Sequence, residues 1–256
     1  ATLAAARAAG RRAWPLLAND PSNPAATDQL LTDPTAEATL VTTLVGQVKS
    51  LGLGGINLDF EGVPGDDQKA FTALVRELAA ALHAAGAGLS VDVVPHAPGA
   101  VDTASAAYDY PALAAAANQI VVMAYDQHSA AGDPGPVAGL DWQAEELAGT
   151  LVNLPRGKVI LGIALYARAW SGDQVSASDY TSAIAQALAQ PGVAYDYDFA
   201  AATPELTSDP GGTPTELWFD DADSLLRKVA QVEQLGLAGI AAWRAGFEDP
   251  AFWSVI

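Results

Sequence analysis

Short β-rich runs alternate along the chain with longer Ala- and Leu-rich stretches that read as helices. Strand runs separated by helical stretches are typical of a parallel sheet whose strands are joined by crossover helices. The pattern therefore predicts an α/β protein. Six strands are expected, near 12–18, 55–60, 89–95, 119–125, 159–165 and 238–243, with helices between them, for example at 67–85 and 221–235.

The segment Ser171–Asp220 is too long for an ordinary connection between the fifth and sixth strands. Turn-forming residues are concentrated in its part Thr203–Thr215. We predict that 171–220 is an insertion within a single domain spanning 1–256, one that could form a wall of a cleft.

Composition narrows the classes of partner. A chain of 256 residues that is 50% hydrophobic can bury one large core, and no apolar run reaches the roughly 18 to 20 residues of a membrane-spanning helix. The absence of cysteine excludes disulfides, thiolate nucleophiles and Cys-ligated zinc. Acidic residues number 30 against 12 Lys and Arg, so the protein repels polyanions and nucleic acid is not expected as a partner.

The segment Gly54-Gly-Ile-Asn-Leu-Asp-Phe-Glu61 carries the strongest chemical signal. Alternate side chains of a strand share a face, so the apolar residues of 56–60 point one way while Asn57, Asp59 and Glu61 point the other. In a protein interior an uncompensated carboxylate costs several kcal/mol. Two carboxylates on one interior face therefore indicate acid/base chemistry.

Two other interpretations of this pair remain open from the pattern alone. Asp59 and Glu61 could lie past the strand end, solvated or capping the next helix. A metal site would need more converging carboxylates, and only Asp92 stands at a comparable strand position, so no metal is expected.

The segment resembles the DxxDxDxE signature of family 18 glycoside hydrolases, the chitinase-like barrels. Three later segments are similar to family motifs in the same order: Met123-Ala-Tyr-Asp126, the run 160–166, and 239–243 with its terminal Trp. An ordered set of four motifs over nearly the whole chain is far more specific than any one of them. The resemblance implies a (β/α)8 TIM barrel without cofactor.

A bacterial subgroup, the spore-cortex and cell-envelope N-acetylglucosaminidase-like enzymes, is the most similar. Its features here are Asn-Leu-Asp-Phe-Glu, Gly135-Pro-Val137 and Trp218-Phe-Asp-Asp221. The chain departs from the chitinase signature at Gly54 and Asn57, where the signature has Asp. Asn57 alters the charge beside Asp59, so the number of protons that the site holds can differ.

The resemblance implies a role for each matching residue. Glu61 would be the general acid and then the general base, with a raised pKa. Asp59 would orient the 2-acetamido group of the substrate, whose carbonyl oxygen attacks the anomeric carbon to give an oxazolinium intermediate. Tyr125 would donate a hydrogen bond to that oxygen.

Four further positions are candidate substrate-binding residues: Asn57, Asp126, Tyr166 and Trp243. Trp243 would form the apolar floor beneath the sugar. Considered one at a time, these residues allow another interpretation. Tyr125 could be a core tyrosine whose hydroxyl is hydrogen-bonded within the protein, and Trp243 could serve only in packing. Their places in the ordered motifs favour the functional interpretation.

The resemblance thus implies a retaining, substrate-assisted glycosidase that acts on a β-linked N-acetylglucosamine polymer outside the cell or in the bacterial envelope. The polymer could be peptidoglycan, an exopolysaccharide or chitin. The alternative is a non-catalytic chitinase-like carbohydrate-binding protein, and retention of Glu61 favours the enzyme. A closed barrel needs eight strands. Since six are expected here, we expect the first two, and any further upstream domains, to precede Ala1 in the natural chain.

Overall fold

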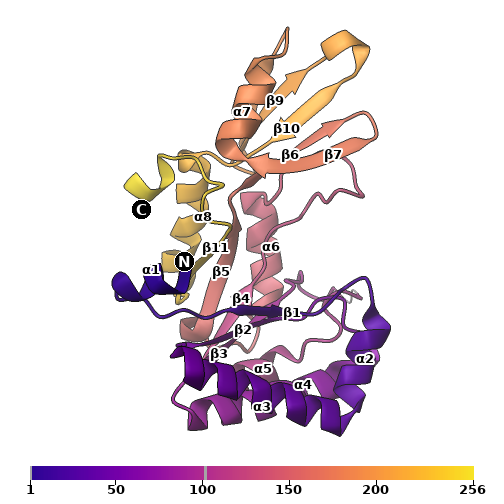
Figure 1. Ribbon diagram of the computed structural model, residues 1–256. Helices are drawn as coiled ribbons and strands as arrows, with labels where there is room; N and C mark the ends of the chain where they lie inside the picture. Colours follow the sequence, from indigo (N-terminus) through magenta and orange to yellow (C-terminus); the bar gives the residue numbers. More distant parts are fainter. Residues whose placement is uncertain (1, 101–102) are drawn as a thin grey trace. The chain divides into compact units, whose positions relative to one another are not determined.

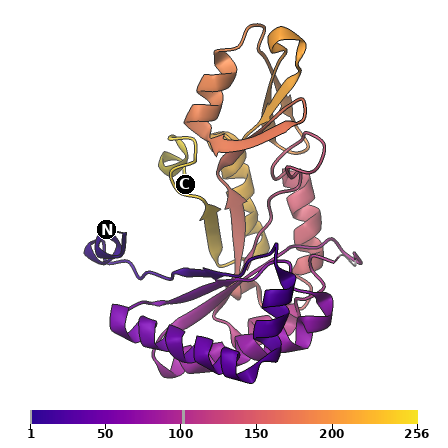
Figure 2. The same ribbon diagram turned by 45° about the vertical axis from the view of Figure 1, so that its right-hand side comes forward.

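The computed structural model describes residues 2–100 and 103–256 and divides into two compact units (Figures 1 and 2). The first unit comprises residues up to 122 together with 150–159. The second comprises 123–149 and 160–256. In the described ranges no helix is both long and apolar enough to cross a membrane.

The first unit contains a parallel sheet in the order β1-β2-β3-β4. Its helices α3, α4 and α5 lie along one side of these strands (Figure 1), and they contact β2, β3 and β4 respectively. The elements are α1 (Thr2–Ala8), β1 (Leu16–Ala18), α2 (Pro24–Thr32), α3 (Pro34–Leu51), β2 (Gly55–Asp59), η1 (Gly65–Asp67), α4 (Gln68–Ala84), β3 (Gly88–Val93), α5 (Tyr110–Ala116), β4 (Gln119–Val122) and η2 (Arg156–Lys158).

Local sequence explains why α3 begins and ends where it does. The Asp33 carboxylate accepts hydrogen bonds from the backbone N–H groups of Thr35 (2.8 Å) and Ala36, which caps the helix N-terminus. Gly52 ends the helix in the left-handed conformation, with φ 56°, which costs a glycine little. The apolar face between these ends is buried through Val41, Leu44 and Val48 and packs toward the sheet.

The second unit contains β5 and β11, which pair in parallel, and α8, which contacts β11. Their residues are β5 (Val159–Ala164, from Ile160 in this unit), α8 (Ala222–Leu235) and β11 (Gly239–Trp243). This unit also contains α6 (Leu140–Thr150, up to Gly149) and η4 (Phe252–Ser254). The six strands expected from the pattern are all present. The first is shorter than predicted, because Pro15 has no backbone N–H with which to extend the ladder.

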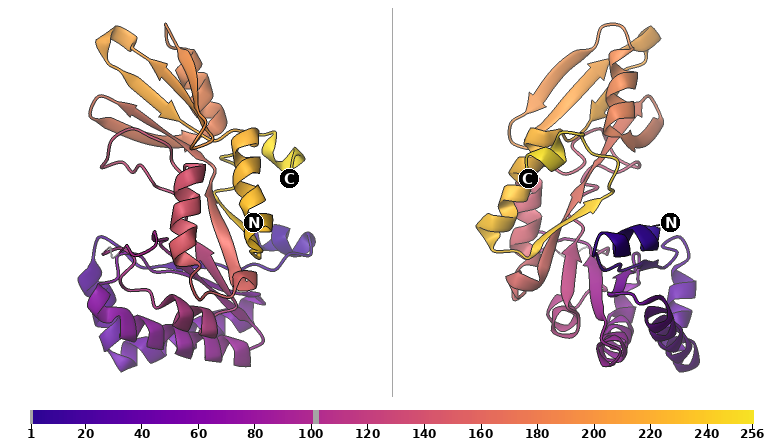
Figure 3. Two further views of the ribbon diagram at one scale, coloured as in Figure 1. Left: turned by 180° about the vertical axis from the view of Figure 1, so that it is seen from behind. Right: turned by 60° about the vertical axis from the view of Figure 1, so that its left-hand side comes forward.

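A five-stranded antiparallel sheet, in the order β7-β6-β10-β9-β8, lies between β5 and β11 in the sequence. Helix α7 lies against this sheet (Figure 3). A small apolar cluster that includes Ala183, Leu206 and Phe219 packs between them. The elements are β6 (Tyr166–Ser171), β7 (Gln174–Asp179), α7 (Tyr180–Leu188), β8 (Ala194–Asp198), β9 (Thr203–Ser208), η3 (Pro210–Gly212) and β10 (Thr215–Trp218).

This sheet confirms the predicted insertion and moves its start. The sheet begins at Tyr166, five residues before the predicted Ser171, because β6 pairs with both β7 and β10. Only Leu165 separates β5 from β6, so one continuous apolar run covers two strands of different sheets. Hydrophobic pattern alone does not divide such a run.

Candidate active site

Strand β2 ends at Asp59, the first predicted catalytic carboxylate, and the second, Glu61, follows two residues after the strand end. Ile56, Leu58 and Phe60 are buried, whereas Asn57 and Asp59 are half-buried and Glu61, one residue past Phe60, is exposed. The burial therefore follows the predicted alternation, with the apolar set facing the helices.

A chain of hydrogen bonds joins β2 to β3 on the polar face. The hydroxyl of Ser90 donates to Oδ1 of Asn57 (2.7 Å), and Nδ2 of Asn57 donates to Oδ2 of Asp92 (2.7 Å). These two contacts fix which way the Asn57 amide points, because its oxygen must accept and its nitrogen must donate. Asn57 thus bridges two residues of the neighbouring strand.

Two carboxyl groups lie on this face, the half-buried Asp59 and the buried Asp92. Asn57 is in register with Ser90, and Leu58 with Val91. One residue further along, Asp59 and Asp92 are therefore neighbours, and strand alternation puts both on the face of Asn57. Oδ1 of each carboxyl is buried and accepts no hydrogen bond.

Burial dominates the electrostatics of both groups. It raises the pKa of Asp59 above its ordinary value. It raises the pKa of Asp92 to about 7; the charges of Asp59 and Glu61 act in the same direction, and the hydrogen bond from Asn57 opposes them. Asp92 is therefore a carboxyl that titrates near neutrality.

The backbone of Glu61 is held from both sides by one side chain. Oδ1 of Asn19 accepts from the Glu61 N–H (2.9 Å), and Nδ2 of Asn19 donates to the Glu61 carbonyl (2.8 Å) and to Oγ1 of Thr27 (2.9 Å). The hydroxyl of buried Tyr108 donates to the carbonyl of Phe60 (2.9 Å). Because these bonds replace ladder contacts past the strand end, they fix where the Glu61 side chain starts.

The second unit brings together three other predicted residues. Tyr166 donates its hydroxyl proton to Oδ1 of Asp126 (2.5 Å), and the rings of Tyr125 and Tyr166 meet edge to face with centroids 6.4 Å apart. Arg168 forms an ion pair with the same Asp126 oxygen (2.7 Å) and also donates to the carbonyl of His128 (2.5 Å). Burial, followed by the Asp126 charge, raises the pKa of Tyr166, while Arg168 opposes the rise.

Asp126 adopts a backbone conformation that few residues other than glycine accept, with φ 64°. Past this turn, the Gln127 N–H donates to the Val137 carbonyl (2.9 Å), and Oε1 of Gln127 accepts from the N–H of Gly139 (2.7 Å). These contacts hold the turn against the segment 137–139. The Asp126 carboxylate is thereby directed to Tyr166 and Arg168.

Trp243 ends β11, and 48% of its surface is exposed. Its carbonyl accepts from the Leu165 N–H (2.8 Å), and its peptide bond to Arg244 is cis. A large apolar ring left in solvent is free to contact a ligand. The predicted site residues thus fall into one group in the first unit, Asn57, Asp59 and Glu61, and one in the second, Tyr125, Asp126, Tyr166 and Trp243.

Sequence reasoning missed three residues that hold these groups: Asn19, Tyr108 and Arg168. A signal for Asn19 was present, since it follows the first predicted strand directly, and polar residues at the C-terminal ends of parallel strands gather at functional sites. Arg168 gave no such signal. It lies within a strand of the insertion, and only the tertiary structure shows that it contacts Asp126.

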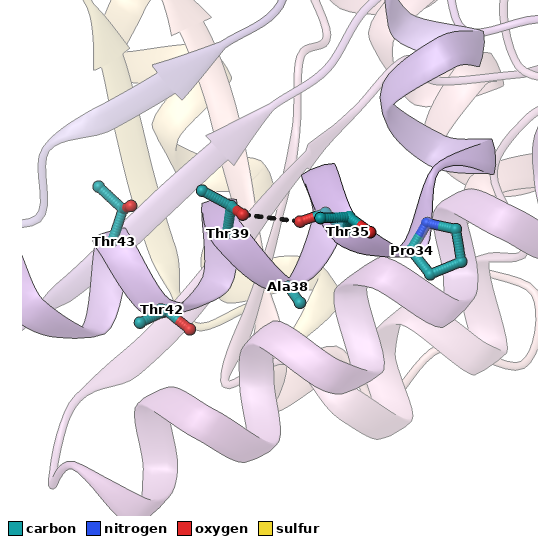
Figure 4. A pocket seen from close by; sticks show the side chains of 6 residues that line it. All are labelled: Pro34, Thr35, Ala38, Thr39, Thr42 and Thr43. Atoms are coloured by element: carbon teal, nitrogen blue, oxygen red, sulfur yellow. Dashed lines mark hydrogen bonds between the residues drawn. The ribbon is translucent and has the colours of Figure 1, made fainter.

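Neither a metal cluster nor the groove on α3 offers an alternative centre. Across 2–100 and 103–256, no group of three or more His, Cys, Asp or Glu side chains could hold a metal ion. Figure 4 shows the depression on α3, where the Thr39 hydroxyl donates to the Thr35 carbonyl (2.7 Å). Its lining has no titratable side chain: Pro34, Thr35, Ala38, Thr39, Thr42 and Thr43.

The chain was compared with known families and proteins. The model of the glycosyl hydrolases family 18 matches residues 22–248. The Bacillus subtilis (strain 168) protein YdhD is 32% identical over 222 residues, which cover 84% of this chain and 52% of YdhD. The cortical fragment-lytic enzyme of Bacillus anthracis is 27% identical over 243 residues, which cover 90% of this chain and 55% of that enzyme. The chain therefore spans about half the length of these curated relatives.

Solved structures give the same result. A chitinase from Chromobacterium violaceum ATCC 12472 superposes with a TM-score of 0.90 at 28% identity, covering 98% of this chain and 81% of the chitinase chain. The spore cortex-lytic enzyme SleL of Bacillus megaterium QM B1551 gives a TM-score of 0.91 at 25% identity, covering 99% of this chain and 61% of that chain. The α/β barrel class is confirmed, with six of its eight parallel strands among the described residues.

Proposed function

Because this chain belongs to the glycosyl hydrolases family 18, we propose that it hydrolyses β-linked polymers containing N-acetylglucosamine. One observation carries the proposal. The exposed Glu61 ends the polar face of β2, beside the half-buried Asp59, while its peptide groups are held by Asn19. General acid catalysis needs a positioned acid that the substrate can reach, and Glu61, exposed on a fixed backbone beside a second carboxyl, fits that need.

The names of the relatives favour one class of substrate. The Bacillus enzymes are named for lysis of the spore cortex or its fragments, and others are named chitinases. Both names point to glycans rich in 2-acetamido sugars. We place peptidoglycan first, ahead of an exopolysaccharide or chitin, and the site of action in the bacterial envelope or outside the cell.

The proposed mechanism gives each step to one of the predicted residues. Glu61 protonates the glycosidic oxygen while the carbonyl oxygen of the substrate's acetamido group attacks the anomeric carbon, so that the glycosidic bond breaks as the oxazolinium ring closes. Asp59 orients the acetamido nitrogen. Glu61, now ionised, then takes a proton from water, which opens the ring and restores the starting anomer.

The remaining predicted residues have supporting roles in this proposal. Tyr125 donates a hydrogen bond to the acetamido oxygen, and Trp243 supplies an apolar floor beneath the sugar, consistent with its exposed ring. Asp126 and Tyr166 contact the sugar through the polar atoms that their mutual hydrogen bond orients. The Asn57 amide donates one of its two protons to Asp92. The second proton binds the substrate beside Asp59.

The test is turnover of peptidoglycan and chitooligosaccharides by the wild type and by Glu61→Gln. The variant should keep its fold and bind ligand, yet lose at least about 100-fold in rate, because general acid catalysis is worth that much. Glu77→Gln, an exposed change on α4, is the matched control and should retain wild-type rate. Ligand binding by a wild type that turns over none of these glycans would instead identify a carbohydrate-binding protein.

A further inference from the structure

Asp92 occupies a place in the first unit that a structural carboxylate rarely holds. It is 7% exposed, and its Oδ2 accepts from Asn57 (2.7 Å) while its Oδ1 has no hydrogen-bond partner. An ionised carboxylate buried in this way loses several kcal/mol of solvation. A neutral carboxylic acid has a much smaller penalty.

The groups that face Asp92 explain why it stays neutral. From β2 it meets Asn57 and Asp59, with the Glu61 charge further along; on the other side, β4 presents apolar Val121 in register. Burial raises the pKa of the Tyr108 hydroxyl, before α5, and the charges of Glu61, Asp59 and Asp92 add to the rise, so Tyr108 also faces this group of carboxyls. Two adjacent carboxyls that share one face are not both ionised at low cost, so one of them retains a proton.

We propose that Asp92 is a positioning residue of the Glu61 site, and that it replaces, from the neighbouring strand, the carboxyl group that the family signature has at the position of Asn57. The pair Asp59 and Asp92 shares one proton across β2 and β3. Asn57 bridges the strands and keeps Asp92 beside Asp59. This inference rests on the proposed function for its activity readout only.

The consequence for catalysis is a coupling between Asp92 and Glu61. Their charges repel each other, so ionisation of Asp92 makes Glu61 hold its own proton to higher pH. Since Glu61 must be protonated to act as the acid, Asp92 extends activity toward alkaline pH. The substitution Asp92→Asn preserves the neutral shape and an oxygen that accepts from Asn57, but it cannot ionise.

The first experiment compares pH profiles of kcat/KM for the wild type and Asp92→Asn. The alkaline limb of the variant's profile should move to lower pH by about one pH unit, the size at which neighbouring groups titrate together, while its acid limb stays in place. The double variant Asn57→Asp/Asp92→Asn returns the carboxyl group to β2. Its alkaline limb should therefore lie at the same pH as that of the wild type. Asp66→Asn, an exposed change in the same unit, should leave the profile in place.

A uniform fall in rate at all pH values for Asp92→Asn, or no restoration by the double variant, would show a merely structural role and overturn the proposal. A second measurement does not depend on turnover. In the 256-residue chain with ¹³C-labelled aspartate carboxyls, one resonance should titrate near pH 7 and disappear in Asp92→Asn. If the protein hydrolyses no glycan, the proposed function fails, and this titration still decides whether the proton-sharing pair exists.

Discussion

The Asn19 side chain contacts Glu61 through both of its backbone polar groups, accepting from the N–H at 2.9 Å and donating to the carbonyl at 2.8 Å. A residue from the end of β1 thereby sets the position of the proposed acid at the end of β2. A carboxylic acid that is misplaced by a fraction of an ångström loses rate because the reacting atoms are no longer aligned.

We expect Asn19→Ala to lower kcat by roughly 10- to 100-fold, with a smaller effect on substrate binding. Asn19→Asp retains an acceptor but loses the donor, so it should fall between the wild type and the alanine variant. Asn23→Ala is the control: the Asn23 side chain caps α2 by accepting from the Ala26 N–H, so this variant should lose stability without losing kcat. Equal kcat for Asn19→Ala and the wild type would contradict the assignment.

Burial of Asp92 predicts how stability depends on pH. Its pKa is raised to about 7 in the folded chain, against an ordinary value of 3.8, so the folded state holds this proton between those values while the unfolded state releases it. The stability contributed by the neutral form is therefore complete below about pH 4 and lost as pH rises through 7.

Asp92→Asn should consequently stabilise the protein more at pH 8 than at pH 4, by up to about 4 kcal/mol above pH 7. Thermal melting at both pH values measures the difference, with Asp66→Asn as the exposed comparison. A gain in Tm that is the same at both pH values would show that folding does not raise the pKa of Asp92.

The second unit contains a buried ion pair whose loss should be costly. Nζ of Lys228 pairs with Oδ1 of Asp220, which also accepts from the Ser224 hydroxyl (2.8 Å); the two charged side chains are 1% and 3% exposed. Lys228→Met leaves the Asp220 charge buried with one weaker donor, so we expect a loss of about 3 to 5 kcal/mol in urea unfolding.

The adjacent residue supplies the control for that change. Arg227 pairs with Asp223 on the same helix, but both side chains are exposed, so Arg227→Met should change stability little. The double variant Lys228→Met/Asp220→Leu should recover part of the loss, because it removes both charges. A similar cost for Lys228→Met and Arg227→Met would mean that the buried pair is solvated in solution.

Substrate assistance makes a prediction about the glycan itself. If the acetamido oxygen is the nucleophile, a de-N-acetylated polymer cannot close the oxazoline ring and should survive digestion. The first product from an acetylated polymer should keep the β configuration, because two successive inversions restore it. Proton NMR of fresh digests reads the anomer. An α product formed first, or cleavage at a glucosamine with a free amine, would require another nucleophile.

Much of the fold was readable from local pattern. Period-two alternation at 56–61 predicted which face of β2 is apolar, because a strand directs successive side chains to opposite sides whatever surrounds it. The crossover pattern likewise predicted six parallel strands and the insertion. The start of the insertion was misplaced by five residues, since the apolar run across Leu165 continues from one sheet into the next.

Local sequence pattern does not predict which residues of different strands contact one another. The sequence by itself determined the order of the motifs and the presence of Glu61, Asp59, Tyr125 and Trp243, and so the family and the class of chemistry. Only the tertiary structure decided that Asn19 holds Glu61 and that Asp92 lies beside Asp59. Those contacts depend on the register between residues 33 or more positions apart in the sequence, which is set by packing of the whole sheet and not by neighbours along the chain.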